Sequence, residues 1–145
     1  MSARFHENGI IAKLKNKRKL SDFLDRLVKK HRKKTEKINL AYIFCTDEYL
    51  LEINMQFLNH KTLTDIITFD LSEDENEMQG EIYISIDRVK ENAEKYEVSY
   101  EEELHRVIFH GALHLCGYKD KTETDIKKMR RQENFCIKQY FNDLN

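Results

Sequence analysis

The stretch from Phe109 to Asp120, FHGALHLCGYKD, places two histidines four residues apart in an otherwise apolar run. Residues at positions i and i+4 lie on one face of an α-helix, one turn apart. The surrounding apolar residues cover most of the helix circumference, which is typical of a helix buried at the centre of a domain. We therefore expect His110 and His114 to lie together on a central, buried helix.

Two imidazoles buried together need partners, because an unsatisfied buried polar group costs about 1–3 kcal/mol. Gly117 permits a left-handed turn at the end of the helix, after which Asp120 can return toward the histidines. Two nitrogens and one carboxylate oxygen suit Zn²⁺ and leave a fourth position for water, as in catalytic zinc sites. We expect a single divalent ion, zinc or a harder ion such as Mn²⁺, at His110, His114 and Asp120.

The alternative is that both histidines are core residues bonded to backbone or water. The spacing alone is a weak indicator, since HExxH proteases share it, but Gly111 stands where those enzymes carry their catalytic Glu. Glycine inside a helix costs about 1 kcal/mol relative to alanine, so Gly111 suggests close approach by another backbone or by a substrate. His105 precedes the pair by five residues and is predicted to be a surface histidine.

Helical and strand patterns follow one another along the rest of the chain. The segment after Thr46 has a predicted inner stripe of Tyr49, Leu50, Ile53 and Phe57. An acidic loop between two strand-like segments predicts a hairpin. Helices are expected at about 18–34, after Thr46, and at 87–96, 99–116 and 122–141, and strands at 37–46, 64–70 and 81–86.

Because no repeat, linker or low-complexity segment interrupts these patterns, we expect one domain over residues 1–145. The fold class is predicted to be α/β (α+β): a single mixed β-sheet of about four strands, packed with about five helices. The metal site would lie on the central helix of that arrangement.

The composition favours a globular cytoplasmic protein. Of the 145 residues, 40% are hydrophobic and 35% are charged. No apolar run reaches the roughly 20 residues of a membrane span, and the N-terminus lacks the apolar core of a signal peptide. Cys45, Cys116 and Cys136 are odd in number and far apart, which fits free thiols in a reducing compartment.

Positive charge gathers at the N-terminal end. Residues 1–37 hold 13 Lys and Arg against 4 Asp and Glu, whereas residues 38–104 hold 4 against 17. Basic runs such as 29–34, KKHRKK, can bind phosphates. One basic run by itself is more often the solvated face of a helix.

The segment HGALHLCGYKD resembles the H-G-x-L-H-L-x-G-Y-x-H signature of the YbeY family of bacterial rRNA-maturation endoribonucleases. INMQFLNHKTLTDIITF and GEIYISIDRVKENA resemble two further segments of that family, so the resemblance covers most of the chain. It implies a single α/β domain that holds zinc at His110, His114 and Asp120. It also implies cleavage of single-stranded rRNA near the 3′ end of 16S rRNA, in maturation and quality control of the small ribosomal subunit.

The chain departs from the family pattern at two positions. Asp120 stands where most members carry His, and Leu58 stands where they carry Arg. His60 or Lys61 could replace the charge of that Arg, and Asp65 precedes a strand, where loops approach sites. These three residues are candidate substrate contacts.

Two other functions remain open from the sequence. One is a metal hydrolase of another substrate, although Gly111 and the basic N-terminal end argue against a protease. The other is a non-catalytic ribosome-assembly or RNA-binding factor whose metal is structural.

Overall fold

Four strands and five helices make up most of the described residues, 1–59 and 64–142, of the computed structural model. The strands are β1 (Ala3–Glu7), β2 (Lys37–Cys45), β3 (Ile66–Asp70) and β4 (Glu77–Ser85). The helices are α1 (Lys17–His31), α2 (Asp47–Leu58), α3 (Ile86–Lys95), α4 (Tyr100–Leu115) and α5 (Glu123–Asn142).

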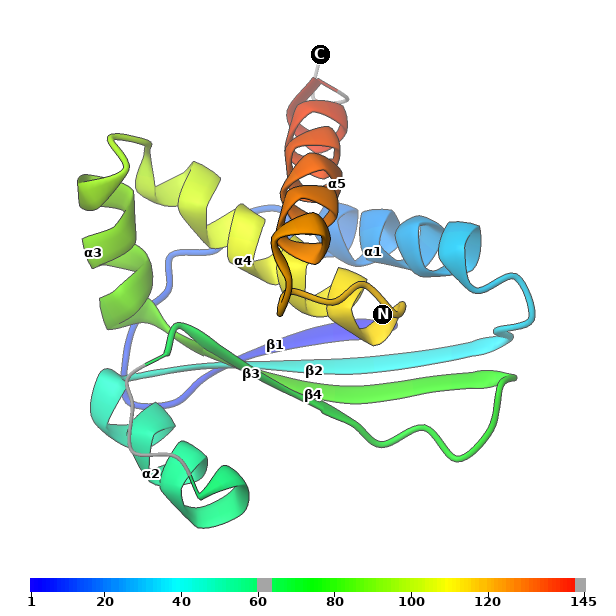
Figure 1. Cartoon of the computed structure of the whole chain (residues 1–145), viewed down its shortest axis with the longest axis horizontal. Helices are drawn as coiled ribbons and strands as arrows, with labels where there is room; N and C mark the ends of the chain where they lie inside the picture. Colours follow the sequence, from blue (N-terminus) through cyan, green and yellow to red (C-terminus); the bar gives the residue numbers. More distant parts are fainter. Residues whose placement is uncertain (60–63, 143–145) are drawn as a thin grey trace.

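The strands form one mixed sheet in the order β1-β2-β4-β3 (Figure 1). β1 and β4 run parallel to β2, and β3 pairs with β4 in the antiparallel direction. The predicted hairpin is therefore confirmed, as is the predicted α/β fold with a mixed sheet of four strands and five helices.

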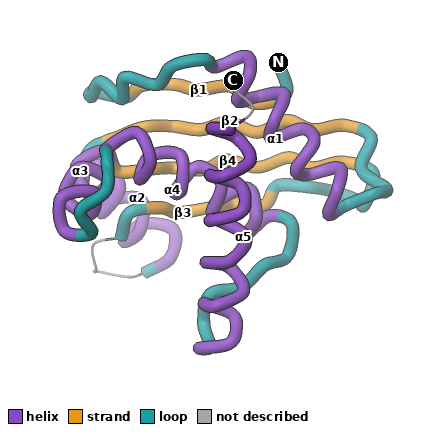
Figure 2. Tube along the Cα trace, turned by 90° about the horizontal axis from the view of Figure 1, so that it is seen from above, coloured by secondary structure: helices purple, strands orange, loops and turns teal. Residues whose placement is uncertain are grey.

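The alternation of side chains along β2 explains why helices cover the sheet. Leu40, Tyr42 and Phe44 are buried in the main core, which they share with α1, α4 and α5. The Tyr42 hydroxyl donates a hydrogen bond to the Ile108 carbonyl oxygen of α4, at 2.9 Å. α1, α4 and α5 lie on one side of the sheet and α2 lies on the other, as Figures 1 and 2 show.

α4 crosses the covered side of the sheet and carries the histidine pair. Its first turn is capped by Ser99, whose hydroxyl accepts a hydrogen bond from the Glu102 amide at 3.0 Å. It ends before Gly117, whose φ of 107° lies in the left-handed region that favours glycine. Both ends of this helix agree with the prediction from the sequence.

Three features differ from prediction. β1 was not expected, because it is a short edge strand in which only Ala3 is fully buried. β4 begins at Glu77 rather than at residue 81, since the acidic segment already pairs with β2 from Lys37 onward. In α2, the predicted inner residues Tyr49 and Phe57 are 37% and 63% exposed.

The smaller core beneath α2 explains this last difference. It contains Leu50 and Ile53 of the helix, together with Cys45 and Ile67 of the sheet. One short helix on this side leaves its outer aromatic residues in contact with solvent. No helix in the described part of the chain is long and apolar enough to cross a membrane.

Candidate functional site

His110 is held by a carboxylate from another helix. Its Nδ1 lies 2.6 Å from Oε2 of Glu133 on α5, and the Glu133 side chain is only 6% exposed. A buried carboxylate is an acceptor, so Nδ1 donates its proton to it and the lone pair of Nε2 points elsewhere. Metal-binding histidines are commonly oriented by a carboxylate in this way.

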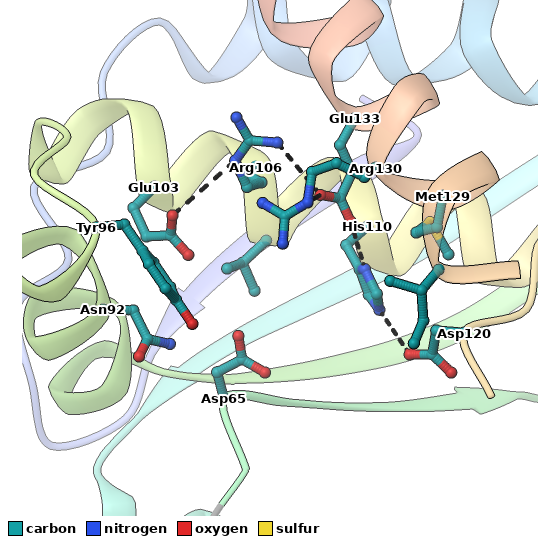
Figure 3. A pocket seen from close by; sticks show the side chains of 12 residues that line it. Asp65, Asn92, Tyr96, Glu103, Arg106, His110, Asp120, Met129, Arg130 and Glu133 are labelled. Atoms are coloured by element: carbon teal, nitrogen blue, oxygen red, sulfur yellow. Dashed lines mark hydrogen bonds and ion pairs between the residues drawn. The ribbon is translucent and has the colours of Figure 1, made fainter. Parts of the chain in front are cut away.

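The other nitrogen of His110 faces Asp120. Nε2 and the Asp120 Oδ2 lie 3.3 Å apart (Figure 3). Two ligand atoms that each lie about 2.0 Å from a tetrahedral zinc ion are about 3.3 Å apart. The turn at Gly117 thus brings the carboxylate back to the helix, and its separation from His110 suits two ligands of one ion.

His114 lies beside these two residues without closing a three-residue site. Together with His110, Asp120, Leu58 and Thr64, it lines an open pocket of about 340 Å³, which we call the His114 pocket. The His114 side chain is exposed, so the prediction of two buried imidazoles is wrong for this residue. Within residues 1–59 and 64–142, no three His, Cys, Asp or Glu side chains are grouped so that they could hold a metal ion.

The exposure of His114 has a simple cause. Helix α4 is buried on the sides that face the sheet and α5, and the open pocket lies between them. His114 therefore has room to change its side-chain rotamer, and it makes no hydrogen bond to another described residue. The residue types of His110, His114 and Asp120 fit a zinc ion, since imidazole nitrogens and carboxylate oxygens are common zinc ligands.

The surroundings of His110 shift its pKa. Burial by itself lowers the pKa of an imidazole, but the hydrogen bond with Glu133 and the nearby carboxylates of Asp65 and Asp120 outweigh it. The pKa of His110 is therefore raised above its ordinary value.

Glu133 also binds arginine, and the sequence reasoning missed this cluster. Its Oε1 lies 3.3 Å from Nη1 of Arg106 and 3.9 Å from Nε of Arg130. A signal was present in the sequence, because Glu133 falls in line with Met129, Cys136 and Tyr140 on the buried stripe of α5. A charged residue in an apolar stripe indicates a buried partner, which here is His110 together with Arg106.

A second pocket opens on the other side of His110. It has a volume of about 260 Å³ and lies between α3, α4 and α5. We call it the Tyr96 pocket, after the aromatic residue on its α3 side, and it shares His110 and Asp120 with the His114 pocket (Figure 3). The two pockets thus meet at the candidate metal ligands.

Of the three predicted substrate contacts, the structure describes Asp65. This residue lines the Tyr96 pocket and its carboxylate points into it (Figure 3). Burial raises the pKa of Asp65, an effect that His110 partly offsets. His60 and Lys61 lie outside the described residues.

His105 is buried rather than exposed, so that prediction is wrong. Its Nδ1 lies 2.7 Å from the Glu101 carbonyl oxygen, and its ring stacks on Tyr140 with 5.2 Å between centroids. Burial lowers the pKa of His105. The residue is 3% exposed because the C-terminal end of α5 packs over it, which its position on α4 alone could not indicate.

Gly111 is approached by side chains, not by backbone or substrate. A Cβ atom at this position would lie 2.9 Å from Cγ2 of Ile82 and 3.0 Å from Cδ1 of Ile66. Glycine therefore lets α4 pack closely against β3 and β4. This close packing determines the distance of His110 and His114 from the sheet.

Comparison with known proteins gives a consistent result. The family model described as endoribonuclease YbeY matches residues 4–141. The endoribonuclease YbeY of Flavobacterium johnsoniae is 49% identical over 121 residues, which are 83% of this chain and 85% of that protein. Its counterpart in Flavobacterium psychrophilum is 58% identical over 99 residues, which are 68% of this chain and 70% of that protein.

A solved structure has a similar fold. The solution structure of a Thermotoga maritima protein superposes with a TM-score of 0.61 at 25% sequence identity. The match covers 98% of this chain and 91% of that one.

Proposed function

Because this chain belongs to the endoribonuclease YbeY family, we propose that it is a metal-dependent endoribonuclease that cleaves single-stranded rRNA. We further propose that it acts near the 3′ end of 16S rRNA on the small ribosomal subunit in the cytoplasm. The observation that carries the metal is the pair formed by His110 and Asp120, with Nε2 and Oδ2 3.3 Å apart beside an open pocket.

His110, His114 and Asp120 would hold the ion. When bound, a zinc or similar divalent ion supplies Lewis-acid catalysis and an activated water for attack on phosphorus. Glu133 keeps the proton of His110 on Nδ1, so that Nε2 is available as a ligand. The carboxylate of Asp120 neutralises part of the charge at the site.

The place of the basic N-terminal segment supports an RNA substrate. His31, at the end of α1, has its Nε2 3.1 Å from the hydroxyl of Tyr118. Tyr118 belongs to the loop that also carries Asp120, so the basic run at 29–34 continues from the edge of the candidate site. Lys29, Lys30 and Lys33 are exposed there and can meet phosphates.

Cleavage of single-stranded rRNA by the purified protein tests the proposal. The protein should cut the RNA, a chelator should abolish cutting, and Asp120→Ala should lower it at least a hundredfold. A matched control is Asp125→Ala, which removes a carboxylate of the first turn of α5 that lines neither pocket. Cleavage that persists in the presence of a chelator would contradict the metal.

Metal analysis separates catalysis from metal binding. Protein purified without added zinc should contain about one ion per chain, and His110→Ala should contain much less. Bound metal without RNA cleavage would support the structural-metal alternative. Equal metal content in the two proteins would exclude His110 as a ligand.

A further inference from the structure

The Tyr96 pocket differs from the His114 pocket in its chemistry. Its volume of about 260 Å³ exceeds the roughly 150 Å³ of a cavity that holds a benzene ring. The pocket therefore has room for one aromatic ring system. It adjoins His110 and Asp120, so a group bound in it would lie next to the reacting part of a substrate.

The wall formed by α3 suits stacking. Tyr96 caps the C-terminal end of α3 and is 53% exposed, with its ring directed into the pocket (Figure 3). Asn92, one turn earlier, adds an amide that can both donate and accept. Across from them, α5 contributes the apolar side chains of Ile126 and Met129. An aromatic face opposite apolar side chains is typical of sites that hold a nucleobase.

The floor of the pocket offers two carboxylates that lack close side-chain donors. The carboxylate of Asp65 is in no salt bridge with another described residue, although its own backbone amide and the charge of His110 both lower its pKa. The carboxylate of Glu103 has a long one, with its Oε1 4.0 Å from Nε of Arg106. Glu133, in contrast, is already engaged by His110 and Arg106. Asp65 and Glu103 thus have acceptor capacity left for a ligand that donates hydrogen bonds.

The burial of these acceptors increases their need for a donor. Burial raises the pKa of Glu103 to about 6 and also raises that of Asp65. Both shifts mean that the carboxylates lack the solvation they would have in water. N–H groups of a ligand would replace it.

The rim of the pocket has the opposite charge. The side chain of Arg130 is 57% exposed, and its guanidinium lies among the residues that line the pocket (Figure 3). Its guanidinium pairs with Glu133 only at 3.9 Å and can turn toward a phosphate outside the pocket. A nucleotide could therefore place its base among the carboxylates and its phosphate at the rim.

We propose that the Tyr96 pocket binds one nucleobase of the RNA strand beside the scissile phosphate and prefers bases with an amino group over uracil. The ring stacks on Tyr96, and the amino N–H groups of guanine, adenine or cytosine donate to Glu103 or Asp65. Uracil has one N–H between two carbonyl oxygens, which the carboxylates repel. This subsite rests on the proposed endoribonuclease function, because it assigns a place to part of that substrate.

Binding of nucleoside monophosphates to the metal-free full-length protein tests the subsite without reference to cleavage. GMP, AMP, CMP and UMP are titrated separately, and the backbone amides of α3 and α5 are followed by NMR. GMP, AMP and CMP should bind at least fivefold more tightly than UMP and should shift the NMR signals of the Tyr96 and Arg130 amides. Tyr96→Leu should weaken their binding about fivefold or more, whereas Tyr96→Phe should retain most of it.

Two further variants complete the test. Tyr49→Leu removes a partly exposed tyrosine of α2, outside the pocket, and should leave nucleotide binding unchanged. Glu103→Gln should reduce the preference over UMP. Equal affinities for all four nucleotides, together with unchanged nucleotide binding in Tyr96→Leu, would overturn the subsite. NMR shifts confined to the basic end of α1 would also overturn it.

The outcome for the subsite is separable from that for the proposed function. Cleavage of RNA without selective nucleotide binding would overturn the subsite and leave the nuclease intact. Selective nucleotide binding without cleavage by the metal-loaded protein would overturn the nuclease and leave the subsite intact.

Discussion

Glu133 occupies a position that α5 otherwise gives to apolar residues. Burying an ionised carboxylate is costly unless it is paired and hydrogen-bonded. Here His110 donates at 2.6 Å and Arg106 at 3.3 Å, so both carboxylate oxygens are satisfied. At the scale of the residue, His110 is thus oriented by the Glu133 side chain, which lies 23 positions away in the sequence.

Gly111→Ala should destabilise the protein by about 1–3 kcal/mol. Alanine gains about 1 kcal/mol of helix propensity, but its Cβ would lie 2.9 Å from Ile82 and 3.0 Å from Ile66. Urea denaturation gives the free energy of unfolding. The double variant Gly111→Ala/Ile66→Val, which removes the Cδ1 atom that the new methyl meets, should recover part of the loss. A stabilised single variant would show that the sheet and helix separate at no cost.

Glu103 should make stability depend on pH. Burial raises its pKa from 4.5 to about 6, so the folded protein binds more protons than the unfolded chain between these values. Stability should therefore fall as pH rises through this window, by roughly 2 kcal/mol in total. In Glu103→Gln this fall should be absent from urea denaturation curves measured between pH 4.5 and 7. Glu101→Gln, an exposed carboxylate of the same turn, should keep the wild-type dependence, and a fall that persists in Glu103→Gln would refute the assignment.

At the scale of the element, the two ends of α4 decide where the histidines stand. Ser99 fixes the first turn and Gly117 the last, and three acidic residues in the first turn complement the helix dipole. A helix that is fixed at both ends has one register on the sheet. His110 and His114 therefore face the pockets rather than the core.

Ser99→Ala should cost about 1 kcal/mol, because the Glu102 amide loses the hydroxyl that accepts its proton at 3.0 Å. Thermal or urea denaturation measures the loss. Ser99→Asp retains an acceptor at the cap and should remain close to wild type. An equal loss in both variants would mean that the loss does not come from the missing hydrogen-bond acceptor.

At the scale of the molecule, charge is distributed unevenly around the sheet. The exposed lysines at the end of α1 continue toward the loop that carries Asp120, through the contact between His31 and Tyr118. Lys34 pairs with Glu75 at 3.5 Å, so part of the positive charge at this end is neutralised.

The positive charge at this end should appear in the salt dependence of RNA binding. If residues 29–34 contact phosphates, affinity for single-stranded RNA should fall steeply with salt, by roughly one released counterion per contact. Replacing Lys29, Lys30, Lys33 and Lys34 by Gln should flatten the slope of log Kd against log salt concentration. The same number of replacements elsewhere, at Lys90, Lys95, Lys128 and Lys138, should change it less. Equal slopes for wild type and the first variant would make this run an ordinary solvated surface.

The features that depend on neighbours along the chain can be predicted from the sequence. The alternation in β2, the cap at Ser99, the left-handed turn at Gly117 and the i, i+4 placement of the histidines all follow from local geometry. The return of Asp120 to His110 also belongs here, because a short turn allows few other paths.

Which of these side chains are buried, and which residues they contact, depends on how the helices pack on the sheet. His105 is covered by α5, His110 is bound by Glu133, and Asp65 faces a pocket formed by three helices. The short strand β1 exists only because β2 offers it a partner. Each of these outcomes is a contact between segments far apart in the chain. The free energy of such a contact comes from the desolvation and pairing of side chains once the helices pack on the sheet. The periodicity within one segment therefore cannot predict it.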